Sequence, residues 1–170
     1  MKCAAVAAPW GMRSWSRRRK DHLRKTHVLL AIDEEAERAR RQAEAVVDLE
    51  LADVTATVLH VFTDNTEGAT ISQFGPARRA REVLSAADVD LTLAETSGES
   101  GEEVLAEANE TGADLVSVAG RKRSPAGKAV FGSVAQEVML NADVPVLYCP
   151  PGGASGGRRE RSEGRRACER

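Results

Sequence analysis

The chain has 170 residues, of which 42% are hydrophobic, so it can form one domain with a buried core. Its formal net charge of −2 combines three unlike parts: +7 over residues 1–26, −12 over residues 27–150 and +3 over residues 151–170. The acidic middle part repels polyanions, which argues against nucleic acid as its partner.

The two ends of the chain differ in composition from the middle. Residues 1–26 lack a sustained hydrophobic period and contain a run of four basic residues, so we expect a basic, disordered extension. Met12 offers an alternative start, and a basic arm for nucleic acid or anionic membrane is the less favoured reading. The Gly/Arg-rich residues 151–170 predict a disordered tail, which leaves residues 27–150 as the folded domain.

The domain begins with alternating strand and helix patterns. Residues 27–33 form an almost continuous apolar run ending in Asp33, as expected of a strand covered on both faces. An amphipathic helical pattern follows over residues 34–52, and Asp33 has the alternative role of capping that helix. Residues 56–62 are rich in β-branched side chains and predict the second strand.

The same alternation continues to residue 149. A helical pattern starts at Pro76, residues 89–94 alternate like an edge strand, and a further helix precedes a strand over residues 114–119. A last helix starts near Ser133, and residues 145–149 predict the fifth strand. This order predicts an α/β fold: a doubly wound five-stranded parallel sheet, expected order 3-2-1-4-5, with helices on both faces.

The stretch from Ala119 to Val134 is a candidate anion site. A strand ends at Gly120, a cationic loop follows, and Gly132 and Ser133 open the last helix. The free N–H groups and partial positive charge at a helix start attract phosphates. Two other readings stay open: a capping box between Ser133 and Gln136, and a loop whose charges are merely solvated.

Several other classes of site are excluded. The spacing from Gly120 to Lys128 does not fit a Walker A loop, and no GxGxxG follows the first strand. The three His and three Cys lack metal-ligand or disulfide spacing. No nucleophile with an identifiable base emerges, so the sequence favours a binding site over a catalyst.

Residues 27–150 resemble a universal stress protein domain. In nucleotide-binding members of that family, the fourth strand ends in a Gly, two residues, a second Gly, nine residues and then Gly-Ser or Gly-Thr. This chain has Gly120, two residues, Arg123, eight residues and then Gly132-Ser133-Val134. Both ends of the motif match, but Arg123 replaces the middle Gly and the loop is one residue shorter.

The resemblance implies cofactor-binding roles for matched residues. Asp33 would lie at the adenosine end of the pocket, Val61 would contact adenine, and Ala119 and Gly120 would line the ribose and first phosphate.

The resemblance places the outer phosphates at the start of the last helix. Gly132, Ser133 and Val134 would hold them there. We hypothesise that Arg123 adds charge-assisted contacts to a phosphate in place of the missing Gly.

Together these features predict a cytoplasmic stress-response protein that binds ATP or another adenine nucleotide, alone or with magnesium. The resemblance implies a homodimer through the fifth strand, with the pairing residues Val144, Pro145, Val146, Leu147 and Tyr148. The alternative is a dimeric protein-interaction module that binds no nucleotide, which the altered middle Gly favours. If the chain has any catalytic activity, we expect no more than slow ATP hydrolysis. The acidic body also resembles halophilic proteins, although an ordinary acidic domain can have the same charge.

Overall fold

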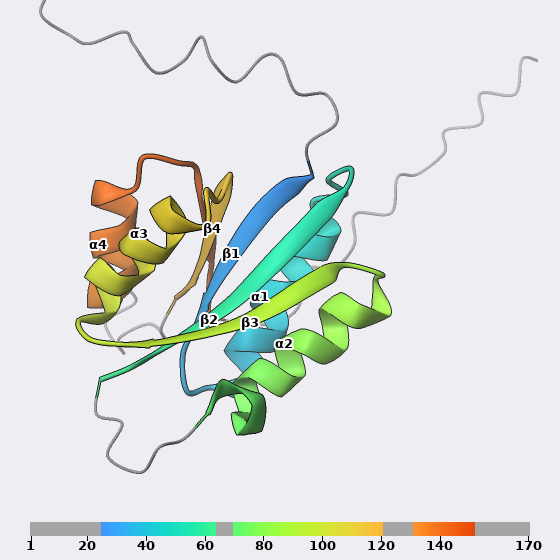
Figure 1. Cartoon of the computed structure of the whole chain (residues 1–170), viewed down its shortest axis with the longest axis horizontal. Helices are drawn as coiled ribbons and strands as arrows, with labels where there is room; N and C mark the ends of the chain where they lie inside the picture. Colours follow the sequence, from blue (N-terminus) through green and yellow to red (C-terminus); the bar gives the residue numbers. More distant parts are fainter. Residues whose placement is uncertain (1–24, 64–69, 121–130, 152–170) are drawn as a thin grey trace, which may run out of the picture.

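The computed structural model describes residues 25–63, 70–120 and 131–151. Within these ranges the chain forms a five-stranded, all-parallel sheet in the order β3-β2-β1-β4-β5 (Figure 1), which confirms the predicted fold class and strand order. The elements in chain order are β1 (Thr26–Ile32), α1 (Ala36–Asp48), β2 (Val54–Phe62), the 3-10 turn η1 (Ile71–Gln73), α2 (Gly75–Ala86), β3 (Asp90–Ser97), α3 (Ser100–Glu110), β4 (Leu115–Ala119), α4 (Ser133–Asn141) and β5 (Val146–Cys149).

The sheet is covered on both faces, and each face has its own core. Helices α1 and α2 lie together on one side, and α3 and α4 lie together on the other (Figure 1). Strand residues alternate between the two cores: Val28 and Leu30 pack toward α1 and α2, whereas Leu29 packs toward α3 and α4. All three are fully buried, as the apolar run in the sequence predicts for a central strand of a parallel sheet.

The order of the strands reverses at β1. Strand β1 pairs with β2 on one side, where Ile32 is opposite His60, and with β4 on the other, where Ala31 is opposite Val118. The chain leaves β1 toward β2 on one side and reaches β4 only later on the other. In doubly wound sheets ligands bind beyond the carboxyl ends of the strands at this reversal.

Helix α1 ends earlier than the sequence pattern indicates. The predicted helix extends to residue 52, but α1 stops at Asp48, and Leu51 lies outside it with 39% of its surface exposed. Glu50 and Asp53 have φ angles of 48° and 50°. Such left-handed residues cannot continue a right-handed helix, so the predicted end was wrong.

Both edges of the sheet are formed by strands recognised in the sequence. The place of β3 at the end of the strand order confirms its prediction as an edge strand, and exposed and half-buried residues alternate along it except at Leu93 and Ala94, which are both half-buried. The four residues of β5 form the other edge. None of the helices in the described ranges is long and apolar enough to cross a membrane.

Candidate functional site

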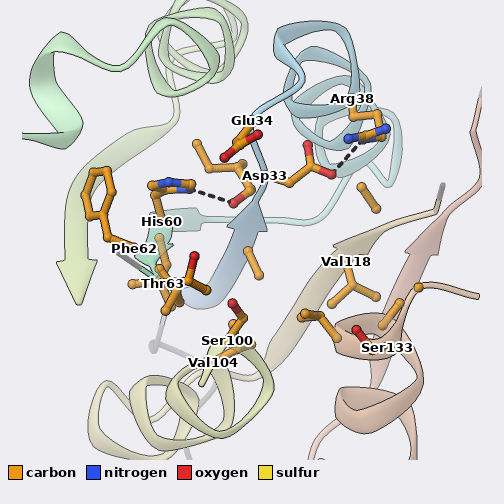
Figure 2. A pocket seen from close by; sticks show the side chains of 18 residues that line it. Asp33, Glu34, Arg38, His60, Phe62, Thr63, Ser100, Val104, Val118 and Ser133 are labelled. Atoms are coloured by element: carbon orange, nitrogen blue, oxygen red, sulfur yellow. Dashed lines mark hydrogen bonds and ion pairs between the residues drawn. The ribbon is translucent and has the colours of Figure 1, made fainter. Parts of the chain in front are cut away.

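A pocket of about 500 Å³ opens at the carboxyl ends of β1, β2 and β4, where the strand order reverses. Figure 2 shows it from close by, with Asp33 following β1 and Thr63 following β2. The starts of α3 and α4 also border it, at Ser100 and Ser133. Its volume lies within the range of ~300–1,000 Å³ typical of small-molecule sites.

One wall of the pocket is apolar. It is formed by side chains that belong to, or pack against, the core beneath α3 and α4: Ala31, Leu59, Val61, Val104, Val118, Val134 and Ala135. Such a wall offers van der Waals contact to a flat or apolar group without competing hydrogen bonds.

The start of α4 provides features that suit an anion. Gly132 is the N-cap of this nine-residue helix, and no side chain caps it. The expected capping box is therefore wrong: Ser133 is the first helical residue, and the backbone N–H of Gln136 bonds to the Gly132 carbonyl at 2.9 Å. Since Gly132, Ser133 and Val134 all line the pocket, the uncapped helix start faces it.

Asp33 lies on the other side of the pocket, in a cluster of charged side chains. Its Oδ1 accepts a hydrogen bond from the Glu35 N–H at 3.0 Å, and its Oδ2 lies 2.7 Å from Nε of Arg38 on α1. The guanidinium of Arg38 also donates from Nη1 to Glu35 Oε2 at 2.6 Å. Figure 2 shows the Asp33–Arg38 pair, with Glu34 beside it.

His60 contacts the same end of β1. Its Nδ1 donates to the Ile32 carbonyl at 3.1 Å, because a carbonyl can only accept. The ring stacks on Phe74 with centroids 4.0 Å apart and meets the edge of Phe62 at 4.5 Å. These contacts tie the end of β2 to β1 and to the residue just before α2, so they hold the pocket's rim in place.

Gln42 ties β1 to β4 behind the pocket. This fully buried side chain of α1 donates from Nε2 to the Ala31 carbonyl at 3.0 Å and to the Ser117 carbonyl at 3.2 Å. A buried amide that joins two neighbouring strands fixes their separation where the crevice forms.

Gly120 has a different environment from the rest of the motif. It does not appear among the residues that line the pocket. Its N–H donates to the Cys149 carbonyl at 2.7 Å, and a Cβ built on it would lie 2.6 Å from Cζ of Tyr148. Close packing against β5 thus accounts for a glycine at this position.

Of the eight predicted site residues, six line the pocket: Asp33, Val61, Ala119, Gly132, Ser133 and Val134. Arg123 lies outside the described residues, as do the two ends predicted to be disordered, residues 1–26 and 151–170, except for residues 25, 26 and 151. The sequence patterns do not identify Arg38, His60 and Ser100 as lining residues. The helical period places Arg38 on the polar face of its helix, and no local pattern shows that it turns toward Asp33.

The described residues contain no group of three or more His, Cys, Asp or Glu that could hold a metal ion. The arrangement of an apolar wall, a carboxylate end and an uncapped helix start is that of a site for an elongated ligand with an anionic end.

The family profile described as "Universal stress protein family" matches residues 25–150. The chain belongs to the universal stress protein family. It is also 27% identical over 103 residues to the stress response protein NhaX of Bacillus subtilis, an alignment that spans 61% of this chain and 58% of that relative.

Solved universal stress proteins share this fold. One from Archaeoglobus fulgidus has 25% identity and a TM-score of 0.63, and the match covers 72% of this chain and 97% of that one. A universal stress protein in complex with cAMP has 20% identity and a TM-score of 0.60, covering 75% and 98%. An Arabidopsis thaliana family protein with AMP bound has 16% identity and a TM-score of 0.52, covering 79% and 97%.

Proposed function

We propose that this universal stress protein binds an adenine nucleotide, ATP among the candidates, in the pocket between β1 and β4, as part of a cytoplasmic stress response. The observation that carries the proposal is the uncapped start of α4, which opens onto a pocket of about 500 Å³ with an apolar wall. The cAMP and AMP complexes of proteins with the same fold support the choice of an adenine nucleotide.

The proposed orientation follows from the chemistry of the two ends. Phosphate oxygens pair best with the free N–H groups at Gly132 and Ser133, where the helix dipole adds positive charge. The carboxylate of Asp33 only accepts hydrogen bonds when ionised, so it suits hydroxyl or amino donors of the nucleoside. The valines of the apolar wall suit the faces of the base.

Nucleotide binding can be tested directly on the purified full-length protein. We expect denaturation to release an adenine nucleotide and added ATP, AMP or cAMP to raise the melting temperature. At a hundredfold excess over the dissociation constant, a ligand adds ~2.7 kcal/mol of stability. If no adenine nucleotide copurifies and none shifts the melting curve, the alternative function, a dimeric interaction module, is favoured. Release of inorganic phosphate from ATP would instead indicate slow hydrolysis.

A pair of variants at the N-cap of α4 tests where the phosphates bind. Gly132 has φ −65° and ψ 155°, which any residue can adopt. In Gly132→Asp the new carboxylate would cap the helix and repel phosphate, so we expect AMP affinity to fall more than tenfold while stability is kept or slightly raised. Gly132→Ala adds a Cβ without charge and is the control. Equal AMP binding by the two variants would contradict this placement.

A further inference from the structure

We infer that Arg38 is a positioning residue, which holds Asp33 as a fixed hydrogen-bond acceptor for the nucleoside end of the ligand. This inference rests on the proposed function and names a residue that lies outside the matched motif. Arg38 belongs to the first turn of α1, and its guanidinium reaches the end of β1 and lines the pocket (Figure 2).

Asp33 is held through both of its carboxylate oxygens. One accepts the Glu35 N–H at 3.0 Å, and the other lies 2.7 Å from Arg38 Nε. A carboxylate has about four lone-pair sites, so two contacts fix its orientation and leave acceptor capacity for a ligand. The Asp33 side chain keeps 32% of its surface exposed, which leaves it accessible from the pocket.

Arg38 is itself firmly placed. Only 17% of its side chain is exposed, and a second contact, from Nη1 to Glu35 Oε2 at 2.6 Å, anchors the guanidinium. Its buried Nε meets Asp33 as an ion pair, at an angle that does not make a hydrogen bond. The pairing therefore acts through charge and position, and Arg38 is engaged with two carboxylates rather than turned outward to solvent.

Charge balance supports the same role. Asp33, Glu34 and Glu35 place three carboxylates in succession beside a pocket proposed to take an anionic ligand. Uncompensated, the three carboxylates would repel one another over the short distances between them. Arg38 contacts two of the three, so it lowers this repulsion while leaving Asp33 as an acceptor.

Replacing Arg38 should weaken nucleoside recognition and spare phosphate recognition. We expect Arg38→Met to bind AMP and adenosine about tenfold more weakly than the wild type, and inorganic pyrophosphate equally well, by isothermal titration. Arg38→Lys should restore part of the loss because it keeps a positive charge. Arg40→Met is the matched control, since Arg40 lies on the same helix, pairs with Glu37 and Glu44, and is absent from the pocket lining.

A double-mutant cycle separates action through Asp33 from direct contact with the ligand. In an Asp33→Asn background, the Arg38→Met substitution should cause no further loss of AMP affinity. A full tenfold loss in that background, or weaker pyrophosphate binding, would show that Arg38 contacts the ligand itself and would overturn the inference. So would wild-type AMP affinity in Arg38→Met.

A ligand-free readout keeps the inference distinct from the proposed function. In a crystal structure of Arg38→Met, we expect the Asp33 carboxylate to leave its position against the Glu35 N–H, and in Arg40→Met to remain there. An unmoved Asp33 in the first variant overturns the positioning role whether or not the protein binds nucleotide. Absence of binding by the wild type would instead contradict the proposed function.

Discussion

Gly120 shows how a single position is constrained by its neighbours. A Cβ there would lie 2.6 Å from Tyr148 Cζ and 2.7 Å from Pro151 Cδ. The Tyr148 ring also packs edge-on against Phe131, with centroids 5.0 Å apart. We expect Gly120→Ala to destabilise the fold by about 1–3 kcal/mol, as overpacking does, in urea unfolding.

Gly75→Ala is the control for that measurement, because no atom outside its chain neighbours lies within 4 Å of a Cβ built at Gly75. It should change the free energy of unfolding by less than ~1 kcal/mol, since the helix preference of alanine is opposed by the restriction that Pro76 places on the preceding residue. Equal stability of Gly120→Ala and the wild type would contradict the packing account.

Cys149 is a second single residue with a predicted effect, a pH dependence of the free energy of unfolding. Burial raises the pKa of this thiol, although its contact with Ser117 Oγ at 3.6 Å opposes the shift. Because the folded-state pKa is raised, the contribution of this thiol to the free energy of unfolding is fully present below the ordinary thiol pKa of ~8.5. It is lost as pH rises from there through the folded-state pKa. We expect the free energy of unfolding under reducing conditions to fall between pH 8 and 10, by at most ~1.4 kcal/mol per pH unit from this group. Cys149→Ala should show a shallower fall, and an identical slope would exclude the contribution.

At the scale of elements, the β5 edge is where we propose that two copies pair. The carbonyls of Pro145 and Cys149 bond to β4, so the alternation of a parallel ladder directs the backbone groups of Val146 and Tyr148 away from it. An unpaired strand edge can add to the same edge of a second molecule. The residues of this predicted interface, 144 to 148, range from half-buried to exposed in the single chain.

Light scattering should therefore give twice the 18.2 kDa mass of one chain. Val146→Pro removes an outward N–H from an edge strand, where proline is tolerated, so it should give a single-chain mass with the circular dichroism spectrum retained. A monomeric wild type, or a dimeric Val146→Pro variant, would refute pairing through this edge.

For the whole molecule, the net charge of −12 over residues 27–150 is the dominant property. Repulsion among surface carboxylates destabilises the compact state, and salt screens it with a Debye length of ~10 Å at 0.1 M. We expect the melting temperature at pH 7.5 to rise by several degrees between 0.05 and about 1 M KCl. Near pH 4, where carboxylates become protonated, the rise should shrink. A melting temperature independent of salt at pH 7.5 would show that the acidic surface is an ordinary one.

Much of the fold could be predicted because its signals are local. Hydrophobic runs marked β1 and β2, alternation marked β3, and helical periods marked the crossovers between them. The position of Asp33 at a strand end and of Gly132 at a helix start follows from those boundaries alone. Both consequently lie at the pocket. The end of α1 was not predictable in this way, because the apolar pattern continues past Asp48 into residues with left-handed backbones.

The sequence by itself determined the alternation of strands and helices, the acidic surface and the residues at the carboxyl ends of the strands, since each depends on neighbours along the chain. Tertiary structure decided which way those residues face. Gly120 packs against Tyr148 because β5 lies beside β4, and Arg38 meets Asp33 because the turn after β1 places the first turn of α1 next to the strand end. The direction of a side chain at a strand end depends on how the elements pack against one another, and no local period encodes it.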